Sequence, residues 1–519
     1  MDYQEIINSI WPDVRKRHLF PELPTPEVVD GGNEAVSIHM AGKTIQLSQE
    51  RLAALSQVMD VADAVSALLD HGVAHHTVCP WDFETHLKLY AQLKPVLLDG
   101  DLVKRVVDYF MDVVVDTHCV REKKSHLPQV YRHMASDKVT DVIRALYQRI
   151  WGQDLHVADM PDVVEKLARI PYLDAKHWGD SIRSFAQVIG PLIDLNAQEG
   201  PGDGSGGMMG AHGMKQYSSG EIEEALEAFA EKGFYAFREM VRDFEEELKD
   251  AGVMPHMGRG KGHTTDSDLL FYMKRAASYR LPVRTRPLEK VGGLHPHSHA
   301  PWEVGKPVQD IDVWTSFGRV MPGISQVWKW QEGETHGAGD GTPDCLVMID
   351  SSGSMTDPGK EFSHAVLGAG CAADAYLRRD RRVAVYNFSD AQANGKEVLD
   401  FGRDRKKIFW ALCRYFGGGT ALHVPDILPL IKPETDIFLI TDMQISNLDA
   451  LMRYLVESKN RVTVVHIGQN RDVARFRQHV EGADHICVYE VNHPEDIPDI
   501  VLAEVKARFG RPPAKKFAL

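Results

Sequence analysis

The chain has 519 residues, of which 43% are hydrophobic and 26% are charged, and its formal net charge is −15 at pH 7. These values are ordinary for a soluble globular protein, and the length predicts about three domains. The acidic balance argues against nonspecific binding to nucleic acid or to an anionic membrane surface, so we expect neither as a partner.

The six cysteines are scattered along the chain and form no C-x-x-C pair. Several lie in apolar runs, which favours reduced, buried thiols over a disulfide framework or a cysteine-based zinc site. The first residues lack the apolar core of a signal peptide, and no apolar run reaches the roughly 18 residues of a membrane span. We therefore expect a cytoplasmic protein with no membrane insertion.

Residues 1–198 are predicted to form a mainly α-helical domain that carries a small β-hairpin. Alternating apolar residues predict two short strands, at 36–40 and 44–47. Apolar residues three and four apart then predict one long helix from Gln49 to about Val78, and further helices follow to about residue 195.

Two histidines and a row of aspartates stand out in this helical region. His71 and His75 are four residues apart, so both rings lie on one helical face and can share a metal ion. Asp108, Asp112 and Asp116 share one face of the helix predicted from Leu102 to about Cys119, and buried carboxylates need a cation or a basic partner. The alternative is that the histidines only pack between helices and that the aspartates are solvated or paired with basic residues.

The hairpin, the H-x-x-x-H-H-x-x-x-P helix and the D-Y-F-M-D-V-x-V-D helix follow one another within residues 35–120. This order resembles the predicted zinc-metallopeptidase-like domains of the gluzincin type. The resemblance implies that His71 and His75 bind Zn²⁺ and that Asp112 is the third ligand. Gly72 stands where the H-E-x-x-H motif has the glutamate that activates the zinc-bound water, so the pattern supports at most a degenerate, non-hydrolytic site.

Residues 199–217 are predicted to be a glycine-rich linker, and residues 218–344 a helical stalk followed by an irregular connector. Ser218 and Glu221 form a capping box that opens a long helix to about Lys249. This helix carries a stripe of phenylalanines, which is typical of a packing face; a coiled stalk is the alternative.

A second helix is expected near Asp268–Tyr279, and an irregular segment after it contains three alternating histidines. His295, His297 and His299 have the spacing to chelate a borderline metal such as Zn²⁺ or Ni²⁺. A loop with hydrogen-bonding histidines is the favoured interpretation.

Residues 345–519 are predicted to form an α/β domain with a doubly wound, mainly parallel sheet. Apolar, β-branched runs alternate there with amphipathic helices, and the near-continuous apolar strands indicate burial on both faces. The predicted strands span 345–350, 382–388, 396–400, 436–441, 461–467 and 485–490, and the predicted helices span 359–378, 404–416, 447–458, 472–481 and 495–509.

Oxygen-bearing side chains follow three of these elements. Asp350, Ser352 and Ser354 form a D-x-S-x-S turn at the end of the first strand, Thr420 follows three glycines, and Asp442 ends a later strand. Parallel strands bring their carboxyl ends to one edge of a sheet, so we expect these oxygens to gather there. Oxygen ligands are those that Mg²⁺ prefers. A helix N-cap would explain one of the loops but not all three.

These five positions match, in order, the metal-ion-dependent adhesion site of the von Willebrand factor A (VWA) domain, which the chain resembles over about residues 345–510. The resemblance implies a bound Mg²⁺ (or Mn²⁺), with Ser352, Ser354 and Thr420 near the ion. Asp350 and Asp442 would ligate it directly or through water, and one position would remain for a carboxylate of a partner. One departure is Met443, which stands where the family often has glycine.

A helical N-terminal region, a glycine-rich linker and a C-terminal domain of this kind follow one another in the chain. This order is similar to that of the MoxR-associated family of CoxE-like and ViaA-like proteins. The resemblance implies an adaptor rather than an enzyme, which works with a MoxR-type AAA+ ATPase in remodelling a client protein or in maturing its metal cofactor. Two alternatives stay open: a zinc-dependent hydrolase, against which Gly72 argues, and an RNA-binding protein of the Ro type, against which the acidic charge argues.

Overall fold

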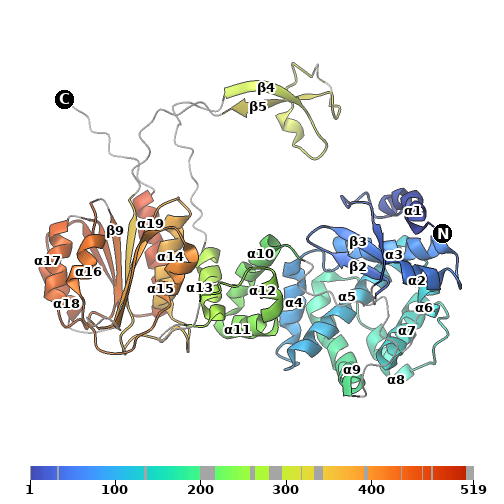
Figure 1. Cartoon of the computed structure of the whole chain (residues 1–519), viewed down its shortest axis with the longest axis horizontal. Coiled ribbons are helices and arrows are strands. Elements are labelled where there is room, and N and C mark those ends of the chain that lie inside the picture. Colours follow the sequence, from blue (N-terminus) through green and yellow to red (C-terminus); the bar gives the residue numbers. More distant parts are fainter. Residues whose placement is uncertain are drawn as a thin grey trace.

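A computed structural model gives the fold of the chain (Figure 1). The structure describes residues 2–31, 34–133, 137–198, 217–257, 264–279, 295–316, 318, 320–331, 343–390, 395–433, 435–458, 460–468 and 472–509. The predicted linker at 199–217 therefore lies, apart from its last residue, outside the described residues. None of the described helices is long and apolar enough to cross a membrane.

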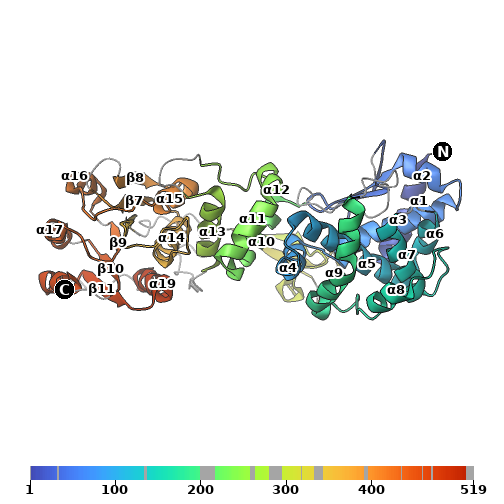
Figure 2. The same ribbon diagram turned by 90° about the horizontal axis from the view of Figure 1, so that it is seen from below.

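The elements form an elongated row, with an N-terminal helical region at one end and an α/β sheet at the other (Figures 1 and 2). A group of helices lies between them. One cluster of buried apolar side chains runs from the N-terminal helices through this middle group to one face of the sheet, and a second cluster fills the other face.

The N-terminal region contains a small sheet of strand order β1-β3-β2, covered by helices. Its strands are β1 (Glu27–Val29), β2 (Val36–His39) and β3 (Thr44–Ser48). Its helices are α1 (Tyr3–Arg17), α2 (Gln49–Leu55), α3 (Val61–Thr77), α4 (Phe83–Leu93), α5 (Gly100–Lys123), α6 (Leu127–Arg132), α7 (Lys138–Trp151), α8 (Pro161–Ala168) and α9 (Trp178–Gln198). The predicted hairpin is confirmed, since Ile38 of β2 lies opposite Ile45 of β3 in an antiparallel pair.

The single helix predicted from Gln49 to Val78 is wrong, because the chain forms α2 and α3 with a break between them. Asp60 starts the second of these helices. Its side chain accepts hydrogen bonds from the backbone N–H groups of Ala62 and Asp63 and so caps a new helix. The apolar spacing continues across the break and hides it from the sequence pattern.

The middle group contains α10 (Ser219–Phe229), α11 (Phe234–Asp243), α12 (Glu245–Asp250) and α13 (Asp266–Ser278). The single helix predicted from Glu221 to Lys249 is wrong: Gly233 has a φ of 108°, which only glycine adopts readily, and interrupts it. The predicted capping box at Ser218 is present. Phe229, Phe234 and Phe237 are buried, so the phenylalanine stripe is a packing face.

Part of the segment predicted to be irregular forms a two-stranded antiparallel sheet of β4 (His295–Pro301) and β5 (Gln326–Gln331). It stands apart from the row of the other elements in Figure 1. In β4 the histidines alternate with Pro296, Ser298 and Ala300, which gives no pattern of large apolar residues, and sequence reasoning therefore missed this strand.

The C-terminal region is a six-stranded sheet of order β11-β10-β9-β6-β7-β8, parallel except for β8. Its strands are β6 (Cys345–Asp350), β7 (Val383–Phe388), β8 (Lys396–Gly402), β9 (Asp436–Thr441), β10 (Val462–Ile467) and β11 (Ile486–Val491). Its helices are α14 (His364–Leu377), α15 (Arg405–Leu412), α16 (Val424–Ile427), α17 (Leu448–Ser458), α18 (Asp472–Val480) and α19 (Ile497–Phe509). Helices α14 and α19 lie on one side of the sheet and α17 and α18 on the other (Figure 1), as expected for a doubly wound fold.

Helix α14 is tightly enclosed, and Gly370 makes this possible. A Cβ atom added at Gly370 would lie 2.7 Å from Cε1 of Phe409, a buried side chain of α15. We predict that Gly370→Ala lowers the free energy of unfolding by about 1–2 kcal/mol, because overpacking outweighs the gain in helix propensity of about 1 kcal/mol. Urea denaturation measures this. Gly220→Ala, at a helical glycine with open space around it, is the control and should not destabilise the protein.

Candidate functional site

Asp350 is the last residue of β6 and the centre of the predicted cation site. Its Oδ1 accepts a hydrogen bond from the backbone N–H of Ser352 at 2.9 Å, and its Oδ2 accepts one from the Thr441 hydroxyl at 2.7 Å. Since Thr441 ends β9, the neighbouring strand, this second bond joins the carboxyl ends of two parallel strands. The hydroxyls of Ser352 and Ser354 lie 3.2 Å apart on the same turn.

Backbone hydrogen bonds bring the three predicted loops together. The N–H of Gly353 in the first loop donates to the carbonyl of Gly418 in the second at 3.0 Å. The N–H of Ser446 in the third loop donates to the carbonyl of Thr420 at 2.9 Å. The structure thus places the residues of all three loops at one edge of the sheet, as the sequence predicts.

The third loop has a special backbone conformation. The carboxylate of Asp442 accepts a hydrogen bond from the N–H of Gln444 at 3.0 Å, which turns the chain back on itself. Met443, between them, has a φ of 65°, in the left-handed region that glycine occupies without strain. Its N–H donates to the Thr441 hydroxyl at 3.0 Å, so a buried methionine is held in this conformation by the same hydroxyl that orients Asp350.

The electrostatics of the cluster suit a cation. Asp350 is only 2% exposed, and its burial, with the nearby charge of Asp442, raises the pKa of its carboxyl group. A raised carboxyl pKa means that the negative charge is poorly compensated by the protein alone. All five side chains offer oxygen, and Ser354 is exposed while Thr420 is half-buried. The donor set therefore fits a hard divalent cation that can be reached from one side.

The three residues of the second candidate site also come together. One ligand atom each from His71, His75 and Asp112 lies within 4.8 Å of the others, and all three side chains are buried between α3 and α5. Asp108 is half-buried and does not belong to this group.

Gly72 is a packing residue of α3. A Cβ atom added there would lie 2.8 Å from Cγ2 of Ile45 in β3. Position 72 therefore faces the small sheet, and a glutamate in its place would displace the buried Ile45 side chain.

The alternating histidines lie on β4, and His299 has partners within the protein. Its Nε2 is 3.2 Å from Oδ2 of Asp312, and its ring centroid lies 3.7 Å from that of Trp328. The side chains of His295 and His297 lie outside the described residues. The expected hydrogen-bonding role is thus seen for His299, but the histidines lie on a strand and not in the expected loop.

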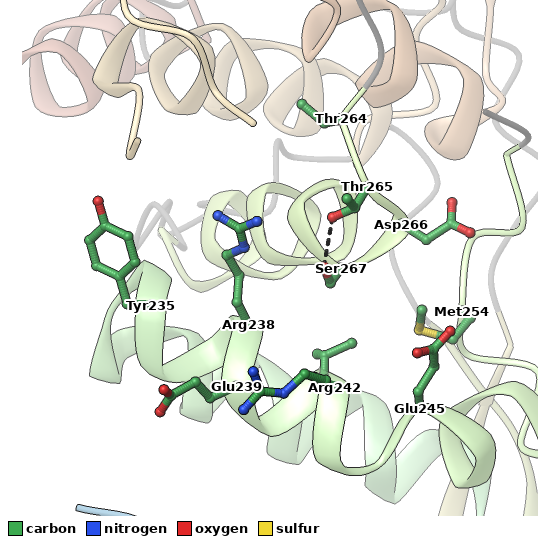
Figure 3. A pocket seen from close by; sticks show the side chains of 11 residues that line it. Tyr235, Arg238, Glu239, Arg242, Glu245, Met254, Thr264, Thr265, Asp266 and Ser267 are labelled. Atoms are coloured by element: carbon green, nitrogen blue, oxygen red, sulfur yellow. Dashed lines mark hydrogen bonds between the residues drawn. The ribbon is translucent and has the colours of Figure 1, made fainter. Parts of the chain in front are cut away.

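A pocket of about 430 Å³ opens between α11 and the start of α13 (Figure 3). Arg238 and Arg242 point into it, but Glu239, Glu245 and Asp266 also line it. Arg238 is bound at 3.0 Å to the buried carboxylate of Asp268. This mixed charge favours no ligand class, and the pocket contains none of the predicted site residues.

No protein-family model and no curated protein matches the chain. Among solved structures, the crystal structure of the SpRpn10 VWA domain is similar, with a TM-score of 0.26 and 15% sequence identity. The match covers 31% of this chain and 94% of that chain. The fold class of the C-terminal region is shown by its own mainly parallel, six-stranded sheet.

We predict that Mg²⁺ stabilises the wild-type protein but not Asp350→Asn. A saturating cation adds about 2.7 kcal/mol at a hundredfold excess over its Kd, whereas the variant lacks the charge that attracts it. In EDTA at neutral pH, Asp350→Asn should be at least as stable as wild type, because burial disfavours the carboxylate that it removes. This advantage should shrink as the pH falls through the raised pKa of Asp350 and the wild-type carboxyl becomes neutral.

Thermal denaturation with and without MgCl₂ measures both effects. Asp400→Asn, the same change at an exposed residue of β8, is the control and should keep the full response to Mg²⁺. An equal Mg²⁺-induced shift in wild type and Asp350→Asn would contradict a cation site at Asp350.

Proposed function

We propose that the chain is a cytoplasmic adaptor that binds a partner protein through a divalent cation held at the edge of the C-terminal sheet. The observation that carries this proposal is the convergence of three loops, which gathers the oxygens of Asp350, Ser352, Ser354, Thr420 and Asp442 at one edge. In this proposal the five side chains belong to a metal-ion-dependent adhesion site of a VWA domain.

The chemistry of recognition follows from the donor set. Mg²⁺ or Mn²⁺ would supply a concentrated positive charge that attracts an acidic side chain of the partner. The Thr441 hydroxyl and the N–H of Ser352 fix the Asp350 carboxylate, so this side chain loses little conformational entropy when the cation binds. Ser354 and Thr420 lie on the accessible side, where a partner carboxylate would approach.

The middle helices support an adaptor role because they contact the segment that follows the first loop. Tyr272 of α13 accepts a hydrogen bond from the N–H of Ser363 at 2.8 Å, and its ring stacks on Phe362 with centroids 6.2 Å apart. Ser363 caps α14, the helix that begins after the cation loop. If partner binding moves this loop and the segment after it, the contacts of Tyr272 would carry that movement to α13.

We assign the partner to the MoxR-type AAA+ ATPases, and the outcome to remodelling of a client protein or maturation of its metal cofactor. The support is the likeness of the domain order to the MoxR-associated family. No observation favours the two alternatives: position 72 has no room for the glutamate of a zinc hydrolase, and a net charge of −15 does not favour the RNA-binding function.

We predict that the purified chain binds a MoxR-type ATPase from the same genome only when Mg²⁺ or Mn²⁺ is present. EDTA, Asp350→Asn and Thr420→Ala should each weaken binding at least about tenfold, since one lost charge-assisted contact is worth roughly 1.5–3 kcal/mol. Surface plasmon resonance or calorimetry measures the affinity, and Asp400→Asn is the matched control. Binding of equal strength in EDTA and in all variants would refute the proposal.

A further inference from the structure

We propose that His71, His75, Asp112 and Asp116 form a closed zinc centre, in which the first three bind Zn²⁺ and Asp116 orients His71. In this centre the ion joins α3 to α5 and stabilises the N-terminal region without hydrolysing a substrate. The proposal concerns residues remote in sequence from the C-terminal cation site and does not depend on the proposed function.

Two distances between ligand atoms bracket the value expected around a tetrahedral zinc ion. Nε2 of His75 lies 3.1 Å from Oδ1 of Asp112, and Nε2 of His71 lies 4.0 Å from the same oxygen. Around a zinc ion with bonds of about 2.0–2.1 Å, tetrahedral ligand atoms lie roughly 3.3 Å apart, between these two values. A carboxylate offers two oxygens, so Asp112 and two imidazoles provide up to four donor atoms.

The hydrogen bonds of the two Nδ1 atoms orient both imidazole rings so that their Nε2 atoms face the Asp112 carboxylate. Nδ1 of His75 lies 2.9 Å from the carbonyl oxygen of Cys79, which can only accept, so this nitrogen carries the hydrogen. Nδ1 of His71 lies 2.7 Å from Oδ1 of Asp116 and donates in the same way. In a neutral ring the Nε2 atom then has a lone pair, and both lone pairs lie near the Asp112 carboxylate. A divalent cation between these acceptors would bind all three at once.

His71 shows this need most clearly. Its side chain is fully buried, and its Nε2 has no hydrogen-bond partner among the residues that the structure describes. A buried polar atom without a partner costs free energy, and buried polar groups in proteins are almost always paired. A zinc ion bound to Nε2 would remove this cost.

Asp116 has the surroundings of a residue that supports a metal ligand. Its Oδ2 accepts hydrogen bonds from the hydroxyls of Tyr147, at 2.7 Å, and of Tyr131. Burial, together with the charge of Asp116, raises the pKa of each tyrosine well above the usual tyrosine value. Both hydroxyls therefore stay protonated and donate hydrogen bonds. Metal-bound histidines commonly donate their second N–H to a carboxylate, which fixes the ring and strengthens the metal bond. Asp116 is therefore a positioning residue for His71.

The environment distinguishes this centre from a hydrolytic one. His71 and Asp112 are fully buried and His75 is 1% exposed, so a substrate has no access to the ligands in this structure. Position 72 faces Ile45, and the glycine there has no side chain that could act as a general base. Asp112 and Asp116 are both buried, and one divalent ion would balance the charge of two carboxylates.

We predict that the full-length protein, purified without chelators, contains about one zinc ion per chain by elemental analysis. His75→Ala should lose the ion and unfold at a lower temperature. His76→Ala, the adjacent histidine of the same helix, is the matched control and should keep it. Cobalt substitution should give the intense visible absorption of a four-coordinate centre in wild type and His76→Ala but not in His75→Ala.

The variant Tyr131→Phe/Tyr147→Phe keeps all three ligands and tests the role of Asp116 if His75→Ala fails to fold. It should weaken zinc binding about 10–100-fold in a chelator competition. Wild type that takes up no zinc, even when zinc is added, would overturn the proposal. Asp350→Asn should retain zinc, so failure of this proposal is separable from failure of the C-terminal site.

Discussion

Burying a carboxylate costs free energy unless hydrogen bonds or positive charge compensate it, and this constraint applies to both candidate sites. Elsewhere in the protein arginine meets it: buried Asp70 lies 2.9 Å from Arg17, and buried Asp268 lies 3.0 Å from Arg238. Around Asp350 the contacts are instead hydroxyl and backbone N–H groups, which orient the charge without neutralising it. A carboxylate that is held in place but not neutralised is suited to binding a cation.

Much of the C-terminal site could be predicted from the sequence because it depends on one rule of fold geometry. Parallel strands end at one edge, so polar residues that follow different strands meet there even when they are far apart in the chain. Asp350 and Thr441 show this directly, since a single hydrogen bond joins the ends of β6 and β9. The conformation of Met443 was not predictable, because only the packing of the third loop imposes a positive φ on a methionine.

The N-terminal site was less accessible to sequence reasoning, for a different physical reason. The helical spacing of His71 and His75 is local, but Asp116, which bonds His71, is held by the hydroxyls of Tyr131 and Tyr147 on two later helices. No periodicity relates these tyrosines to α3, so only the tertiary fold reveals them. The breaks before α3 and α11 escaped prediction similarly, because one capping aspartate and one glycine outweighed a continuous apolar pattern.

The two sites differ most in exposure, and exposure determines what each can do. An ion enclosed by His71, His75 and Asp112 would exchange only when the helices separate, so it would contribute to stability. An ion beside exposed Ser354 could be reached by a partner without unfolding anything. Helix α13, which holds the segment after that loop through Tyr272, lies between the two regions.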